Sequence, residues 1–188
     1  MIRGRRVREH LVLSLAAALT RVALHAAGLP FTFALDWMWL ADPADLRGSL
    51  AETLYYFHAF PPGMNLVTSV LLRLGGDEAQ AVASIAWWIL GIVLVNALFH
   101  LCRAAGLSSR AAFAAALGFS LLPQMIYFEH LSHYELSVTV LLLLAAVLFH
   151  AGVTRQTTWP WLGCFLAGAA IVLTRSLFHL AWFAALAG

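Results

Sequence analysis

The sequence has 188 residues, of which 62% are hydrophobic and only 11% are charged, and its formal net charge is +2. Soluble domains contain about 45–50% apolar and about 25% charged residues, so this composition excludes an ordinary soluble domain and indicates an integral membrane protein. The first apolar stretch is preceded by four arginines, which are typical of positive-inside anchoring and require no nucleic-acid partner: Arg3, Arg5, Arg6 and Arg8.

The first apolar stretch covers residues 11–29 and is long enough for one membrane span of about 20 residues. Arg21 and His25 interrupt it, and no small-residue cleavage site follows, so a retained span is favoured over a cleaved signal peptide. Arg21 has two interpretations. Its guanidinium either extends along the helix to the lipid headgroups, or faces the bundle as the partner of an acidic group.

Residues 30–78 form the first predicted extracytoplasmic loop, and residues 36–66 are its polar part. Asp42 followed by Pro43 predicts a helix start, with Asp at the N-cap and Pro at the first helical position. The apolar face of this helix is predicted to consist of Leu46, Leu50, Leu54 and Phe57. Residues 64–74 are apolar but too short to cross a bilayer, which predicts a juxtamembrane or half-inserted helix.

Four further spans are predicted, at residues 79–102, 111–128, 136–154 and 159–186. Pro123 lies near the end of the span at 111–128, and Arg175 and His179 interrupt the last one. The distribution of arginine between alternate connections favours a cytoplasmic N-terminus. The sequence therefore predicts a single all-α transmembrane domain over residues 1–188, a polytopic helical bundle with about five spans and amphipathic juxtamembrane helices in the first outer loop. An odd number of spans predicts that this domain is the N-terminal part of a larger bundle.

Two carboxylates of the outer loop are candidates for acid–base chemistry. Asp42 is first of all a helix cap, but a carboxylate where the loop meets the outer leaflet can also act as a general base on a polar acceptor. Asp36 is its rival because it comes soonest after the first span and is followed by Trp37, Met38 and Trp39. The alternative for Asp36 is an ordinary acidic residue at the membrane interface.

An aromatic patch is predicted at the end of the amphipathic helix, made of Tyr55, Tyr56, Phe57, His58 and Phe60. Such a patch anchors a helix at the interface; the alternative is that it stacks on a sugar or that His58 contacts a lipid phosphate.

No metal site is predicted. Glu129, His130, His133 and Glu135 do not match the HExxH pattern, and two histidines three residues apart lack a third ligand, so solvated loop residues are favoured. Cys102 and Cys164 lie in or beside apolar stretches and offer neither a disulfide framework nor metal-ligand spacing. No cofactor is predicted.

Three segments together carry a resemblance: LADPADLRGSLAETLYYFHAFPPGMNL in the outer loop, YFEH near residue 129, and LTRSLFHLAW in the last span. The chain resembles the family 39-like glycosyltransferases of bacterial membranes, distant relatives of protein O-mannosyltransferases and of the aminoarabinose transferase that acts on lipid A. The resemblance implies a C-type glycosyltransferase (GT-C) fold in the bacterial inner membrane. It also implies transfer of a sugar from a polyprenyl-phosphate donor to an extracytoplasmic glycan, lipid or protein acceptor.

The resemblance also implies roles for particular residues. The acid of the family's first outer loop corresponds to Asp42, with Asp36 as second choice, and the substrate loop comprises His58, Pro61, Pro62, Asn65 and Glu129. We expect Arg175 and His179, one helical turn apart, to bind the donor phosphate, with Arg21 as a secondary candidate. A non-catalytic membrane scaffold or transporter subunit is the alternative function, in which the same acids are caps and the same arginines are anchors.

Overall fold

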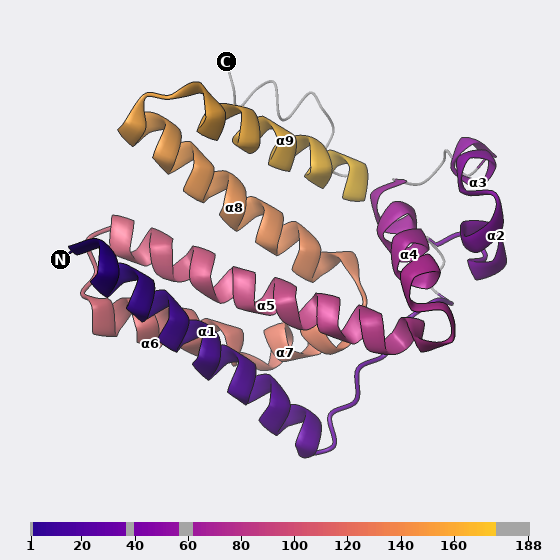
Figure 1. Cartoon of the computed structure of the whole chain (residues 1–188), viewed down its shortest axis with the longest axis horizontal. Helices are drawn as coiled ribbons and strands as arrows, with labels where there is room; N and C mark the ends of the chain where they lie inside the picture. Colours follow the sequence, from indigo (N-terminus) through magenta and orange to yellow (C-terminus); the bar gives the residue numbers. More distant parts are fainter. Residues whose placement is uncertain (1, 37–39, 57–61, 176–188) are drawn as a thin grey trace.

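The computed structural model describes residues 2–36, 40–56 and 62–175, and these residues are helical apart from the connections between helices (Figure 1). The helices are α1 (Ile2–Ala26), α2 (Pro43–Gly48), α3 (Leu50–Tyr56), α4 (Pro62–Gly75), the 3₁₀ turn η1 (Gly76–Glu78), α5 (Ala79–Ala104), α6 (Ser109–Ser120), α7 (Pro123–His130), α8 (Tyr134–Arg155) and α9 (Thr158–Thr174). The prediction of an all-α chain is confirmed for this part of the molecule.

Helix α5 is the centre of the bundle. It packs against α1, α4, α6, α7 and α8, while α9 packs along α8. The largest completely buried side chains include Trp87, Leu94 and Phe99 of α5 together with Leu13 of α1 and Leu136 of α8. In Figure 1 the helices α2, α3 and α4 lie beyond one end of the bundle, and the N-terminus lies at the other end.

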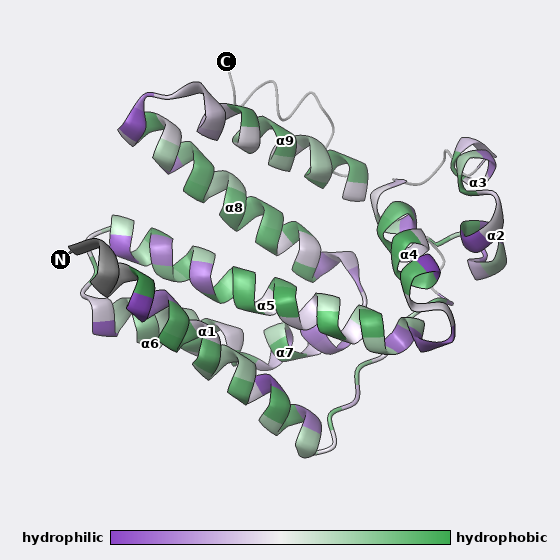
Figure 2. Cartoon of the chain, in the orientation of Figure 1, coloured by the Kyte–Doolittle hydropathy of each residue, from purple (hydrophilic) through white to green (hydrophobic). Residues whose placement is uncertain are grey.

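Helices α5 and α8 belong to the two helical stretches that are long and apolar enough to cross a membrane. Figure 2 shows both as mainly hydrophobic along their middle turns. Helices α6 and α7 are each too short to cross a membrane, but together they are long enough for a third span. That span would be broken, because the two helices meet at an angle of 58°. Helix α9 is apolar but shorter, and α1, which contains Arg21, is not among the candidates. The structure therefore supports two or three spans, and the predicted five are not confirmed.

The span predicted at residues 111–128 is divided into two helices in the structure. Helix α6 ends at Ser120, and α7 begins at Pro123, which occupies the first turn of the new helix. Proline has no N–H to donate and its ring collides with the carbonyl four residues earlier, so a continuous helix cannot pass through Pro123 without a kink. The break changes the direction of α7 and places Glu129 inside the bundle.

The outer-loop helix is also divided. We expected one amphipathic helix through Leu46, Leu50 and Leu54, but α2 ends at Gly48 and α3 begins at Leu50. Gly48 and Ser49 are poor residues for a helix interior, and Ser49 instead accepts a hydrogen bond from Thr53 N at 2.8 Å, which starts the second helix.

Three of the other predicted helices agree with the structure, one begins earlier than predicted, and one is described only in part. The short helix expected at residues 64–74 is α4, the spans expected at 79–102 and 136–154 are α5 and α8, and the helix of the first span begins earlier than residue 11. Of the last predicted span, at 159–186, the structure describes the part up to Arg175, and α9 ends at Thr174.

Candidate functional site

Asp42 caps helix α2. Its carboxylate Oδ1 accepts a hydrogen bond from the backbone N of Ala44 at 2.7 Å, and Pro43 is the first helical residue. The predicted helix start is therefore confirmed. Asp42 is exposed, so its carboxylate remains accessible to solvent although it caps the helix.

Asn65 fixes the chain immediately before Asp42. Its side chain is only 1% exposed, and Asn65 Oδ1 accepts a hydrogen bond from Ala41 N at 2.9 Å. Because Asn65 belongs to α4, this bond ties the backbone immediately before α2 to α4. Asn65, which we expected in the substrate loop, therefore helps to fix the position of Asp42 through the neighbouring residue Ala41.

Helix α2 is held on α4 by further contacts at one carbonyl. Leu46 is completely buried, and its carbonyl oxygen accepts hydrogen bonds from Ser69 Oγ at 2.6 Å and from Arg73 Nε and Nη2 at 3.3 Å each. These three donor atoms satisfy one carbonyl in the last turn of a short helix, where the helix itself leaves carbonyl groups without partners. Ser69 and Arg73 were not among the sequence candidates.

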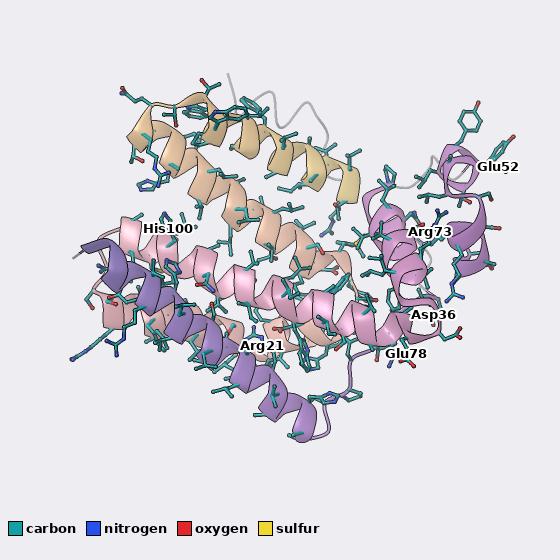
Figure 3. All side chains as sticks on the ribbon, viewed as in Figure 1. Arg21, Asp36, Glu52, Arg73, Glu78 and His100 are labelled. Carbon is teal, nitrogen blue, oxygen red and sulfur yellow. The ribbon has the colours of Figure 1, made fainter. Side chains whose placement is uncertain are left out.

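Asp36 follows a segment that is tied to the connection between α7 and α8. Thr32 and Leu131 form an isolated parallel bridge, and Ala34 N donates to Ser132 Oγ at 2.8 Å. These contacts hold residues 31–34 against the bundle, and Asp36 is exposed beyond them. Figure 3 labels Asp36 at the same end of the molecule as Glu52, Arg73 and Glu78.

Arg21 lies inside the bundle and pairs with Glu129. Arg21 Nε donates to Glu129 Oε1 at 2.6 Å and Arg21 Nη2 donates to Oε2 at 2.9 Å, while the two side chains are 3% and 5% exposed. Arg21 Nη1 donates to the carbonyl of Ala17 at 2.9 Å and to Thr20 Oγ1 at 3.2 Å. The structure confirms the interpretation of Arg21 as the bundle-facing partner of an acid. Glu129 occupies the two guanidinium nitrogens of Arg21 that we expected to bind a donor phosphate.

Gly91 of α5 makes room for this ion pair. A Cβ atom at Gly91 would lie 2.6 Å from Glu129 Oε1 and 2.8 Å from Arg21 Nη2. No other residue fits there without displacing the pair, since Cβ atoms essentially never approach a neighbour this closely. Sequence reasoning missed Gly91, although a lone glycine inside a long apolar helix is a known signal of close approach.

The expectation that Glu129 and His130 are solvated loop residues is wrong. Both belong to α7, and they are 4% and 8% exposed, because the break before Pro123 turns this helix into the bundle. His130 Nδ1 lies 2.8 Å from the carbonyl of Ile126. Glu129 is therefore an internal ion-pair partner and not an accessible residue of a substrate loop.

His133 and Glu135 lie closer to the surface, with His133 Nδ1 3.8 Å from Glu135 Oε2. Within the described ranges, no group of three or more His, Cys, Asp or Glu side chains could hold a metal ion. Cys102 and Cys164 are both free thiols.

Arg175 lies at the C-terminal end of α9, not within a helix. Its backbone is extended, with φ −142° and ψ 122°, and its guanidinium carbon lies 4.9 Å from the centre of the Tyr134 ring. The expectation that Arg175 continues a helix toward His179 is therefore wrong at Arg175 itself, and His179 lies outside the described residues.

The end of α9 meets the start of α4. A Cβ atom at Gly63 would lie 2.7 Å from the carbonyl oxygen of Leu173 and 2.8 Å from Thr174 Oγ1, so only glycine allows this approach. Pro62 is the first residue of α4. His58 and Pro61, the other predicted members of the substrate loop, are not among the residues that the structure describes.

Comparison with known protein families, with curated proteins and with solved structures finds no match for this chain.

Proposed function

We propose that this chain belongs to a membrane glycosyltransferase that transfers a sugar from a polyprenyl-phosphate donor to an extracytoplasmic acceptor. The observation that carries the proposal is the contact between Gly63 of α4 and residues 173–174 of α9. This contact brings Arg175 to the end of the bundle that also holds the acidic outer loop. This transfer needs an accessible carboxylate as a base and a cation for the leaving phosphate, and Asp42 and Arg175 are the candidates at this end of the bundle.

In the proposed reaction the acceptor hydroxyl attacks the anomeric carbon of the donor, and the bond from that carbon to the phosphate oxygen breaks. Asp42 accepts the proton of the hydroxyl, with Asp36 as the alternative base. The polyprenyl phosphate leaves with the bonding electrons, and Arg175 stabilises its negative charge. Arg21 and Glu129 have no part in these steps, because each neutralises the other inside the bundle.

Contacts that hold the two proposed catalytic groups in place support the proposal. Asn65 fixes the backbone of Ala41, the residue before Asp42, and the Asp42 carboxylate caps α2, so the carboxylate is placed at the start of a helix and not in a free loop. Tyr134 faces the guanidinium of Arg175 and orients it. Tyr55 and Tyr56 of α3 are 75% and 72% exposed, which favours an interfacial position for the outer-loop helices.

The test is turnover by the full-length protein in proteoliposomes, with undecaprenyl-phosphate-linked hexoses and pentoses as labelled donors. Asp42→Asn is expected to abolish transfer while the protein remains folded, because Asn is as good an N-cap as Asp. Asp36→Asn is expected to have a milder effect. Glu52→Gln is the matched control, since Glu52 is an exposed acid of the same loop.

A second variant tests the phosphate role. Arg175→Lys is expected to weaken donor use strongly, because lysine lacks the planar fork that binds two phosphate oxygens. Arg155→Lys, an exposed arginine at the end of α8, is the control. Full activity of both Asp42→Asn and Asp36→Asn contradicts the proposed base. Absence of transfer by the wild-type protein with every donor favours a scaffold or transporter subunit instead.

A further inference from the structure

A second polar site lies at the end of the bundle opposite α2, α3 and α4. A pocket of about 200 Å³ is lined there by Glu9 and His10 of α1, by Phe99, His100 and Arg103 of α5, and by His150 of α8. Figure 3 labels His100 at this end, far from Asp36 and Glu52. Three of the eight histidines of the sequence meet in this one pocket, although they come from three different helices.

The ring of His10 is held in a fixed orientation. His10 Nδ1 lies 2.7 Å from Asn96 Oδ1, while Asn96 Nδ2 donates to Ser14 Oγ and to the carbonyl of Ile92, both at 2.9 Å. Because the amide nitrogen already donates twice, Oδ1 is the acceptor and His10 Nδ1 carries the hydrogen. The edge-on contact with Phe99, with ring centres 5.1 Å apart, fixes the ring further.

The pocket offers groups that can bind an anion. Arg103 is a permanent cation, Glu9 is the one carboxylate among the lining residues, and the three imidazoles add ring nitrogens that can donate hydrogen bonds. The rings of His100 and His150 lie 6.3 Å apart, and Arg103 Nη1 also donates to the carbonyl of Leu107.

An apolar groove adjoins the pocket. It lies between α5 and α8, has a volume of about 420 Å³, and is lined by Ile92, Val93, Ala97, Leu144 and Val147 in addition to Asn96 and His100. His100 therefore belongs to both hollows. Since α5 and α8 are apolar helices of membrane-spanning length, an apolar groove between them is suited to a hydrocarbon chain.

We propose that the pocket and the groove together bind one anionic phospholipid. Its phosphate lies against Arg103 and the imidazoles of His10, His100 and His150, and one acyl chain follows the groove between α5 and α8. A polar pocket alone would suit free phosphate equally well, but the adjoining apolar groove matches a ligand with a charged head and a hydrocarbon tail. Basic pockets between transmembrane helices bind anionic headgroups in this way. The lipid belongs to the leaflet on the side of the N-terminus.

The test measures binding of phosphatidylglycerol to the purified full chain by native mass spectrometry, with phosphatidylcholine and inorganic phosphate as comparison probes. Arg103→Gln is expected to weaken phosphatidylglycerol binding about tenfold, the size of one lost charge-assisted hydrogen bond. Arg155→Gln is the matched control, because Arg155 is exposed at the same end but does not line the pocket. Equal losses in the two variants would show diffuse surface attraction and overturn the proposal.

The groove is tested separately. Val147→Trp fills it from α8 and is expected to reduce phosphatidylglycerol binding while leaving binding of inorganic phosphate unchanged. Wild-type lipid affinity in Val147→Trp, or phosphate binding as strong as lipid binding, would refute the lipid and indicate a free-phosphate site. Equal affinity for phosphatidylcholine and phosphatidylglycerol would refute selection for an anionic headgroup. Far-UV circular dichroism verifies folding, and His150→Gln replaces Arg103→Gln if the latter does not fold. None of these measurements needs sugar transfer, so the outcome is independent of the proposed function.

Discussion

Replacing Glu129 by Gln removes the carboxylate that neutralises Arg21 inside the bundle. The glutamine side chain has nearly the same shape, but it accepts with one oxygen only, so the bidentate contact at 2.6 and 2.9 Å is lost. Arg21 is 2% exposed and would be left as a buried cation without a counter-charge, bonded only to the one glutamine oxygen, to Ala17 and to Thr20. Removing one partner of a buried ion pair costs about 3–5 kcal/mol. We expect Glu129→Gln to lower the free energy of unfolding by about this amount.

The assay is unfolding in mixed micelles of dodecyl maltoside and sodium dodecyl sulfate, followed by circular dichroism. Glu52→Gln, at an exposed acid of α3, is the control and is expected to change the free energy of unfolding by less than about 0.5 kcal/mol. The double variant Arg21→Met with Glu129→Leu is expected to be more stable than Glu129→Gln alone, because apolar residues replace both charges. Stability of Glu129→Gln within about 0.5 kcal/mol of the wild type would refute the argument.

Three further predictions concern the fold. Gly91→Ala is expected to destabilise the protein by about 1–3 kcal/mol in the same assay, because crowding of the ion pair outweighs the gain of about 1 kcal/mol in helix propensity; a more stable variant would contradict this. Asp42→Ala is expected to cost about 0.5–2 kcal/mol and to speed hydrogen exchange at the Ala44 amide, whereas exchange in Asp42→Asn should remain close to that of the wild type. A cysteine at Ser49 is expected to react with an impermeant thiol reagent only from the extracytoplasmic side, and labelling from the cytoplasmic side would reverse the proposed topology.

The sequence by itself determined the features that depend on neighbouring residues. Apolar stretches of sufficient length predicted α5 and α8, and the Asp42 and Pro43 pair predicted the start of α2. These signals are local, because a cap and a helical period involve residues only a few positions apart. The division of α2 from α3 was missed, although the weak helix formers Gly48 and Ser49 were a local signal for it.

Only the tertiary structure decided which polar residues meet. Arg21 and Glu129 are separated by 108 positions. Their pairing requires that the chain break before Pro123 and turn α7 into the bundle, and that residue 91 be glycine, because a Cβ atom there would collide with the pair. The pocket of His10, His100 and His150 likewise exists only because the N-terminal part of α1 lies beside the C-terminal parts of α5 and α8. An isolated charge in an apolar helix shows that a partner is required, since burial without one is costly. It does not identify that partner, because the choice depends on how helices far apart in the sequence pack against one another.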